Sequence, residues 1–268
     1  LMRKDKARIV FTDPPYNVPI NGHVGGLGNI QHAEFAMASG EMSEDEFTTF
    51  LTSSLGHLAD SCVDGALLYI CMDWRHLWEL LNAGRNVNLS QINLCIWNKD
   101  NGGMGSMYRS KHELVSVFKV GNDSHINNIE LGRYGRYRTN VWDYPGVNTF
   151  RQGRMEELQL HPTVKPVALV EDVILDASQR GEIVLDCFGG AGTTLLAAEH
   201  VGRKARVMEL EPHYVDITLR RWETATGNQA VHDVSGLSFT DIESQRLGQP
   251  STSNITLETD AKETAHGR

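Results

Sequence analysis

The sequence predicts an α/β fold with a mostly parallel sheet and crossover helices. Apolar runs of strand length alternate along the chain with segments of helical spacing, which is the pattern of strands joined by helices. Near residue 190, a strand, a glycine-rich turn, a helix and a strand that ends in acids follow one another. This order is typical of a nucleoside-binding unit in the same class of fold.

Each element is supported by its own local pattern. Apolar runs predict strands at 7–12, 66–72, 89–97, 111–118, 182–185 and 205–208. Ser43 and Glu46 form a capping box that opens a helix, and Asp73 is expected to cap the next one. Further helices are expected at 167–178, 195–201 and 214–224. The segment 17–40 is rich in Gly, Asn and His and is predicted to be a long functional loop.

Composition limits the partners of the chain. Its 268 residues carry a formal net charge of −9 and its pI is about 5.6, so a nucleic-acid partner would need a local basic patch. The four cysteines lack C-x-x-C spacing, so we expect no metal site and no disulfide framework, with an intracellular compartment as the default. No segment has the pattern of a membrane span or signal peptide. Because Leu1 leads at once into a core strand, we expect a fragment of something longer.

The first strand ends in the turn Asp13-Pro14-Pro15-Tyr16. Two consecutive prolines stop the strand, because proline lacks the N–H that the ladder needs. The strand tip then presents a carboxylate, proline-region carbonyls and an aromatic face. This combination suits a planar group with an exocyclic NH2, whose N–H bonds need acceptors and whose ring needs a stacking partner. The alternative is a stiff turn in which Asp13 caps and Tyr16 fills space.

A second motif lies at the tip of the strand 182–185 and continues as Asp186-Cys187-Phe188-Gly189-Gly190-Ala191-Gly192-Thr193-Thr194. Glycines let the backbone approach a ligand and aim helix N–H groups at an anion. Glu209 follows the next strand, at the distance where an acid can accept both ribose hydroxyls of a nucleoside cofactor.

The segment 131–138 is unusual in this acidic chain because its basic and aromatic residues have no acid between them. It is a candidate for contacts with phosphates and bases, and the alternative is a solvated loop with arginine stems packed on tyrosine. At the mouth of the strand 111–118, His112 and Glu113 could touch substrate, but we expect them to be solvated. The candidate DNA contacts are Arg133, Tyr134, Arg136, Tyr137 and Arg138.

Together the two motifs resemble the amino-methyltransferases that use S-adenosyl-L-methionine to methylate exocyclic amines of DNA bases. His161-Pro162-Thr163-x-Lys165-Pro166 resembles a third motif of that family. With the catalytic motif first and the cofactor loop last, the order resembles the β-class. Cys187 and Ala191 depart from the family's usual proline and serine.

The resemblance implies a Rossmann-like methyltransferase fold: a twisted seven-stranded sheet with one antiparallel strand, helices on both faces and a permuted motif order. It implies a methyltransferase domain over 1–226, with a variable target-recognition segment at about 121–159. A C-terminal extension at 227–247 and a disordered tail at 248–268 would follow. The expected setting is a prokaryotic or phage cytoplasm near the nucleoid, with double-stranded DNA as partner, no membrane, and a monomer or a homodimer.

Carried over by position, the resemblance assigns a role to each matched residue. The target base would be held by Asp13, Pro14, Pro15 and Tyr16. Phe188 and Leu210 would flank the cofactor adenine, and Glu209 would hold the ribose. The methionine end would be shaped by Gly190, Gly192, Thr193, Thr194, Asp186, His161, Thr163 and Lys165.

Adenine N6 is the expected target, because Asp13 resembles the adenine enzymes, whereas serine is commoner there in the cytosine N4 enzymes. The base would have to be flipped out of the duplex. Cytosine N4, an RNA base and a protein glutamine remain alternative acceptors. The glycine loop alone would also fit a nicotinamide-dependent oxidoreductase, and a non-catalytic DNA-binding relic would keep the same motifs.

Overall fold

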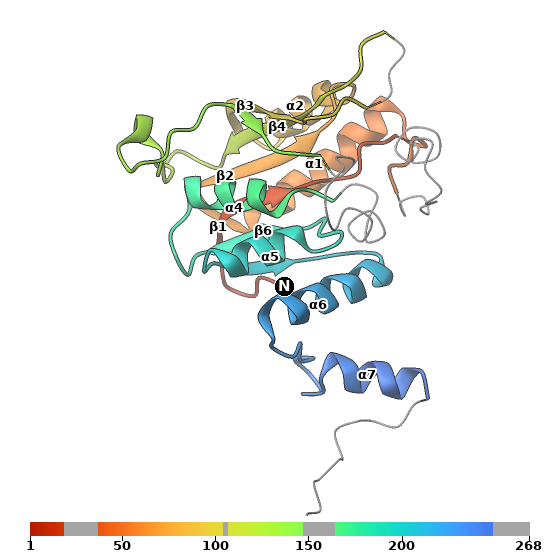
Figure 1. Cartoon of the computed structure of the whole chain (residues 1–268). Helices are drawn as coiled ribbons and strands as arrows, with labels where there is room; N and C mark the ends of the chain where they lie inside the picture. Colours follow the sequence, from red (N-terminus) through yellow and green to blue (C-terminus); the bar gives the residue numbers. More distant parts are fainter. Residues whose placement is uncertain (19–36, 104–106, 147–163, 249–268) are drawn as a thin grey trace, which may run out of the picture. The chain divides into compact units, whose positions relative to one another are not determined.

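The computed structural model of the chain describes residues 1–18, 37–103, 107–146 and 164–248 (Figure 1). It consists of two compact units, Leu1–Arg221 and Trp222–Arg268. The first unit holds the sheet and both sequence motifs. No helix in the described part of the chain is long and apolar enough to cross a membrane.

A seven-stranded sheet in the order β5-β3-β4-β2-β1-β6-β7 forms the centre of the first unit. Strand β4 runs antiparallel to both of its neighbours, whereas the other paired strands are parallel. The expected mostly parallel sheet with one antiparallel strand is therefore confirmed. The strands are β1 (Ala7–Thr12), β2 (Cys62–Met72), β3 (Ser90–Asn98), β4 (His112–Lys119), β5 (Val141–Asp143), β6 (Ile183–Asp186) and β7 (Lys204–Val207).

Helices cover both faces of this sheet (Figure 1). On one face, α4 and α5 pack with Ile9 and Phe11 of β1 in one hydrophobic core. On the other, α1 and α2 pack with Val10 in a second core, so successive β1 side chains point to opposite faces. A strand buried on both faces explains the unbroken apolar run in the sequence. The helices are α1 (Glu44–Asp60), α2 (Leu77–Asn86), α4 (Val167–Ala177), α5 (Thr193–His200), α6 (Pro212–Thr226) and α7 (Phe239–Arg246).

The capping box at the start of α1 is present as predicted. Ser43 accepts from the backbone N–H of Glu46, and the Glu46 carboxylate accepts from the Ser43 N–H at 2.9 Å. The expected cap of α2 is different. Asp73 accepts from the N–H groups of Arg75 and His76, in the turn before the helix, so it stabilises that turn and not the first turn of α2.

Besides the 3-10 helix η1 (Glu130–Gly132), two short elements were not predicted from the sequence. Strand β5 has only three residues and exists because it pairs with the end of β3, a contact that no local pattern encodes. In the second unit, α7 begins after Ser238, whose hydroxyl accepts from the Asp241 N–H at 3.1 Å. Ser238 is a regular N-cap, but α7 lies in a segment that is polar almost throughout.

The carboxyl ends of β1, β6 and β7 meet at one edge of the sheet. Strand β1 pairs with β2 on one side and with β6 on the other, so the order of strands along the chain reverses beside it. Such a switch point is where open α/β sheets bind ligands, because the loops that leave the two strands diverge there. The topology therefore predicts a ligand site between the turn after β1 and the glycine loop after β6.

Candidate active site

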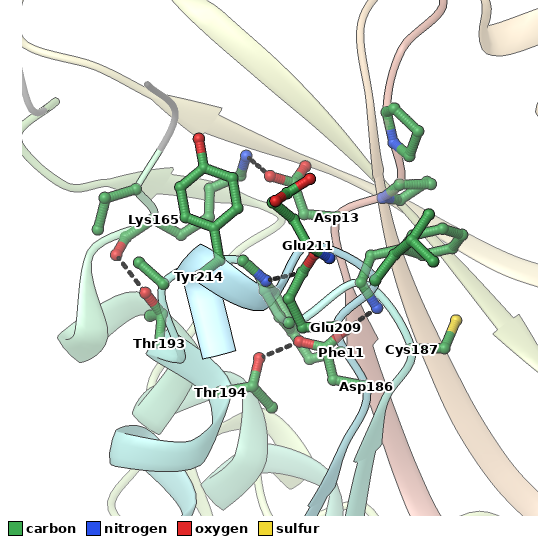
Figure 2. Close-up of a pocket in the computed structure, with 18 of the residues that line it drawn as sticks. Phe11, Asp13, Lys165, Asp186, Cys187, Thr193, Thr194, Glu209, Glu211 and Tyr214 are labelled. Carbon is green, nitrogen blue, oxygen red and sulfur yellow. Dashed lines mark hydrogen bonds and ion pairs between the residues drawn. The ribbon is translucent and has the colours of Figure 1, made fainter. Parts of the chain in front are cut away.

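A cavity of about 590 Å³ opens at this edge of the sheet. Its walls are the turn after β1, the glycine loop after β6, the acidic end of β7 and the first turn of α6 (Figure 2). The volume is in the range of pockets that enclose drug-sized or cofactor-sized ligands. The two motifs, 173 positions apart from Asp13 to Asp186, thus border one space.

The turn Asp13–Tyr16 is fixed by the residue that follows it. Asn17 has a φ of +53°, and its side-chain oxygen accepts from the N–H groups of Gly40 and Met42. Its amide also donates to the Met42 carbonyl at 2.8 Å. The buried Asn17 side chain therefore ties the turn to the segment before α1, while the prolines end β1.

Asp13 lies in a cluster of charged side chains that come from three parts of the chain. The Tyr16 hydroxyl donates to Asp13 Oδ1 at 2.5 Å. Lys165 Nζ donates to Asp13 Oδ2, as Figure 2 shows. Lys165 Nζ also lies 3.0 Å from Glu113 Oε2 at the start of β4. Glu113 Oε1 in turn accepts from Lys99. The resemblance implied that Lys165 helps to hold the methionine end of the cofactor. Its ammonium group reaches Asp13 in the acceptor turn.

Burial and charge act in opposite directions on these groups. Burial raises the pKa of Asp13, and the Lys165 ammonium lowers it by less, so the pKa stays above its ordinary value. Burial would also raise the pKa of Glu113, but Lys165 and Lys99 lower it to about 2. Burial would lower the pKa of Lys165, whereas the carboxylates of Asp13 and Glu113 raise it well above its ordinary value. Glu113 and Lys165 are therefore both charged at neutral pH.

Asp186 ends β6 and holds the glycine loop. Its Oδ1 accepts from the Thr12 hydroxyl at 2.6 Å and from the Phe188 N–H at 3.0 Å, and its Oδ2 accepts from the Thr194 hydroxyl at 2.7 Å. Burial raises the pKa of Asp186 to about 6, against the lowering effect of these hydrogen bonds. The carboxylate thus joins β1, the loop and the first turn of α5.

The loop packs too closely for side chains at two of its glycines. A Cβ on Gly189 would lie 2.3 Å from Val207 Cγ1, and one on Gly192, whose φ is +79°, would lie 2.6 Å from Thr218 Cγ2. Gly192 is also the residue before α5, which starts with Thr193. The glycines therefore allow the loop to lie against β7 and α6 with the N-terminal end of α5 beside the cavity.

Glu209 stands at the tip of β7. Its Oε2 accepts from the Gly190 N–H at 2.7 Å and its Oε1 from the Glu211 N–H at 2.8 Å. These bonds leave further lone pairs on a half-buried carboxylate at the cavity wall. Phe188 and Leu210 supply apolar surface to the same wall.

The basic segment is divided by the structure into two groups. Arg136 and Arg138 form ion pairs with Asp172 and Asp176 of α4, at distances of 2.6 to 3.2 Å, so their charges are already compensated. The sequence interpretation counted only acids inside the segment, and contact of Arg136 and Arg138 with DNA stays a prediction. The side chains that remain exposed are Arg133, Tyr134 and Tyr137.

Some of the predicted site residues cannot be placed. His161 and Thr163, together with 19–36 of the expected loop, lie outside the described residues. Conversely, the structure adds Glu113, Lys99 and Tyr214, none of which was assigned to the site from sequence. Tyr214 lies in α6 and lines the cavity. The signal for Glu113 was an acid at the mouth of an apolar strand, which is more often solvated. In the described part of the chain no group of three or more His, Cys, Asp or Glu side chains could hold a metal ion.

The fold and the cavity define an α/β protein with a ligand-sized cavity at the switch point of its sheet. The chain belongs to the DNA methylase family of N6 and N4 methyltransferases, whose family model matches residues 7–220.

Two bacterial relatives illustrate the range of similarity. The chain is 42% identical to the DNA adenine methyltransferase YhdJ of Escherichia coli (strain K12) over 87 residues, which are 32% of this chain and 28% of that protein. It is 22% identical to the type II methyltransferase M2.MboI of Moraxella bovis over 225 residues, 81% of each chain.

Solved structures share the fold. The M1.HpyAVI-SAM complex has a TM-score of 0.61 and 19% identity, covering 82% of this chain and 90% of that one. The cytosine-N4-specific PvuII DNA methyltransferase has a TM-score of 0.62 and 15% identity, covering 85% of this chain and 86% of that one.

Proposed function

We propose that this chain transfers a methyl group from S-adenosyl-L-methionine to an exocyclic amine of a flipped DNA base, adenine N6 in particular. The observation that carries the proposal is the shared cavity. An acceptor turn built for an NH2 group and a glycine loop built for a nucleoside border one volume of about 590 Å³. Membership of the DNA methylase family supports the same reaction.

The cavity wall around Glu209 fits the nucleoside part of S-adenosyl-L-methionine. A carboxylate with free lone pairs suits two ribose hydroxyls, and Phe188 and Leu210 offer apolar surface to an adenine ring. Gly190, Gly192, Thr193 and Thr194, held by Asp186, would shape the methionine end. When bound, the cofactor supplies a methyl group on a positively charged sulfur, which keeps the bonding electron pair as the methyl leaves.

The turn after β1 would hold the target amine. An exocyclic amine is a poor nucleophile because its lone pair is delocalised into the ring. Hydrogen bonds from its two N–H groups to Asp13 and to the Pro14 carbonyl would favour a pyramidal nitrogen, with Tyr16 stacked on the base. The main contributions are then positioning and electrostatics, and no covalent link between enzyme and base is needed.

Two observations favour adenine over cytosine. The residue at the turn is Asp13, and a relative that is 42% identical over 87 residues is named a DNA adenine methyltransferase. The named cytosine N4 enzyme matches only in fold, at 15% identity. Duplex DNA is the proposed partner, and Arg133, Tyr134 and Tyr137 are its proposed contacts outside the cavity because they are exposed.

The test is direct identification of the product. The purified protein is incubated with methyl-labelled S-adenosyl-L-methionine and with duplex DNA, RNA or glutamine-containing protein in separate reactions. Mass spectrometry of the digested products should find labelled N6-methyladenine from DNA alone. N4-methylcytosine as the sole product would overturn the choice of base, and label confined to RNA or protein would overturn DNA as the substrate.

A further inference from the structure

Glu113 is a buried acid to which no motif assigns a task. It is the second residue of β4, and 16% of its side chain is exposed. Its Oε2 lies 3.0 Å from Lys165 Nζ and 3.2 Å from the Tyr16 hydroxyl oxygen, while its Oε1 accepts from Lys99. Glu113 therefore contacts both residues that contact Asp13.

The number of donors and acceptors allows the Tyr16 hydroxyl to change its hydrogen-bond acceptor from Asp13 to Glu113. The Lys165 ammonium has three N–H bonds and three acceptors, namely Asp13 Oδ2, Glu113 Oε2 and the Tyr16 oxygen at 3.4 Å. The Tyr16 hydroxyl has one proton and two carboxylates within reach, Asp13 Oδ1 at 2.5 Å and Glu113 Oε2 at 3.2 Å. If the proton turns to Glu113, Asp13 Oδ1 is released without leaving any donor unpaired.

Counting charges shows why a second acid is needed. Without Glu113, Asp13 would be the one carboxylate beside two ammonium groups, those of Lys165 and Lys99, and the Lys165 side chain is only 6% exposed. With Glu113 and Lys99 included, two carboxylates balance two ammonium groups. During the transfer the target nitrogen uses its lone pair for the new bond, gains positive charge and then returns one N–H proton to water. A net positive cluster beside that nitrogen would oppose the transfer.

Resting on the proposed function, we propose that Glu113 is a positioning residue for methyl transfer. It holds Lys165, compensates its charge, and takes the hydrogen bond of Tyr16 so that Asp13 can accept from the target amine. Sequence reasoning missed this role, because Glu113 acts through residues that lie 52 and 97 positions away.

The first test needs no substrate or cofactor. Within the described part of the chain, the titratable or charged groups around Asp13 are Tyr16, Cys71, Glu113, Lys165 and Asp186, with Lys99 beyond Glu113. Carbon-13 NMR of the Asp13 carboxyl in Glu113→Gln should show a lower pKa than in the wild type, because a nearby negative charge is lost. Glu79→Gln is the matched control, since Glu79 is a buried acid of α2 outside the cluster. An unchanged Asp13 pKa in Glu113→Gln would overturn the proposal.

A second variant, expected to shift the Asp13 pKa in the opposite direction, gives an independent measurement if Glu113→Gln folds poorly. Lys99→Met removes an ammonium group whose partner is Glu113, from a side chain that is 25% exposed. It should raise the Asp13 pKa, since the uncompensated Glu113 charge then acts on Asp13. A shift of the same sign in both variants would show general disturbance and would overturn the charge argument.

Kinetics then tests the connection to the reaction. In Glu113→Gln, kcat on DNA should fall about ten- to a hundredfold with KM for S-adenosyl-L-methionine unchanged, and the acidic limb of the kcat profile should move to lower pH. A rise in KM alone would overturn the positioning role. Wild-type protein that methylates no substrate would instead refute the proposed function, while the NMR titration would still decide whether Glu113 controls Asp13.

Discussion

Two networks of acidic and basic side chains in this protein have similar composition and different surroundings. One joins Asp13 and Glu113 to Lys165 and Lys99 at the edge of the cavity. The other joins Asp172 and Asp176 of α4 to Arg136 and Arg138, and its polar partners are the side chains of α4 and the Tyr144 hydroxyl.

The difference shows that paired charges do not by themselves indicate a site. In the cavity network, Asp13 keeps 20% of its side chain exposed, toward a space large enough for a ligand. In the α4 network the four charged groups pair with one another and fasten 136–138 to the helix. We therefore assign chemistry to the first network and stability to the second, and the following variants separate the two.

The largest effect is expected for Asp13→Ala. Loss of the carboxylate removes an acceptor that acts on the target nitrogen in the transition state, so kcat should fall by about a thousandfold or more with the affinity for S-adenosyl-L-methionine retained. Single-turnover kinetics and calorimetry measure the two quantities. Asp172→Asn is the control from the other network and should keep normal turnover. Normal turnover by Asp13→Ala would remove Asp13 from the mechanism.

The second effect is on stability. Arg138→Ala leaves Asp176, which is 4% exposed, with one of its two arginine partners, so the free energy of unfolding should fall by about 2–4 kcal/mol. Urea denaturation followed by circular dichroism measures it. Arg133→Ala is the control, because its exposed pair with Glu130 should contribute nothing measurable. Equal stability of the two variants would contradict the structural assignment of Arg138.

A smaller effect is expected for Glu209→Ala at the cofactor wall. The proposed bidentate acceptor for ribose is lost, and binding of S-adenosyl-L-methionine should weaken by about 1–3 kcal/mol. Isothermal titration calorimetry tests this, with Glu171→Ala as an acidic control from α4 outside the cavity. Wild-type affinity in Glu209→Ala would exclude this residue from ribose binding.

The smallest effect is expected for Arg133→Ala in DNA binding. Loss of one phosphate contact should weaken binding to duplex DNA a few fold and reduce the slope of log K against log salt by about 0.9. Fluorescence anisotropy over a salt series gives both values. Lys204→Ala is the control, since Lys204 begins β7 at the edge of the sheet away from the cavity. An unchanged salt slope in Arg133→Ala would leave this segment without a role in DNA binding.

Local patterns predicted much of this fold, and the pairing of distant residues was beyond them. The capping box of α1 needs only Ser43 and Glu46, three positions apart, and it was predicted correctly. The acidic partners of Arg136 are Asp172 and Asp176 of α4, 36 and 40 positions away. They lie outside 131–138, so the prediction that Arg136 contacts DNA did not take them into account.

The candidate site shows the same limit. The turn at Asp13 and the glycine loop are each a continuous stretch of sequence, so each could be recognised from local pattern alone. Both border the cavity. Lys165 was singled out by its motif, but its contact with Asp13 spans 152 positions and was not foreseen. The antiparallel pairing of β4 with β2 and β3, which sets Glu113 opposite Trp97, brings Glu113 to the cluster, and no spacing rule encodes that.

The pairing of β1 with β6 has a consequence for how such enzymes diverge. It sets the two strand tips one inter-strand spacing apart, roughly 4.8 Å, through backbone hydrogen bonds that any side chains permit. The distance between the proposed cofactor loop after β6 and the proposed acceptor turn after β1 is thus set by the sheet. Substitutions in either loop can change which substrate is modified. They leave the spacing between the two strand ends unchanged, because the backbone sets it.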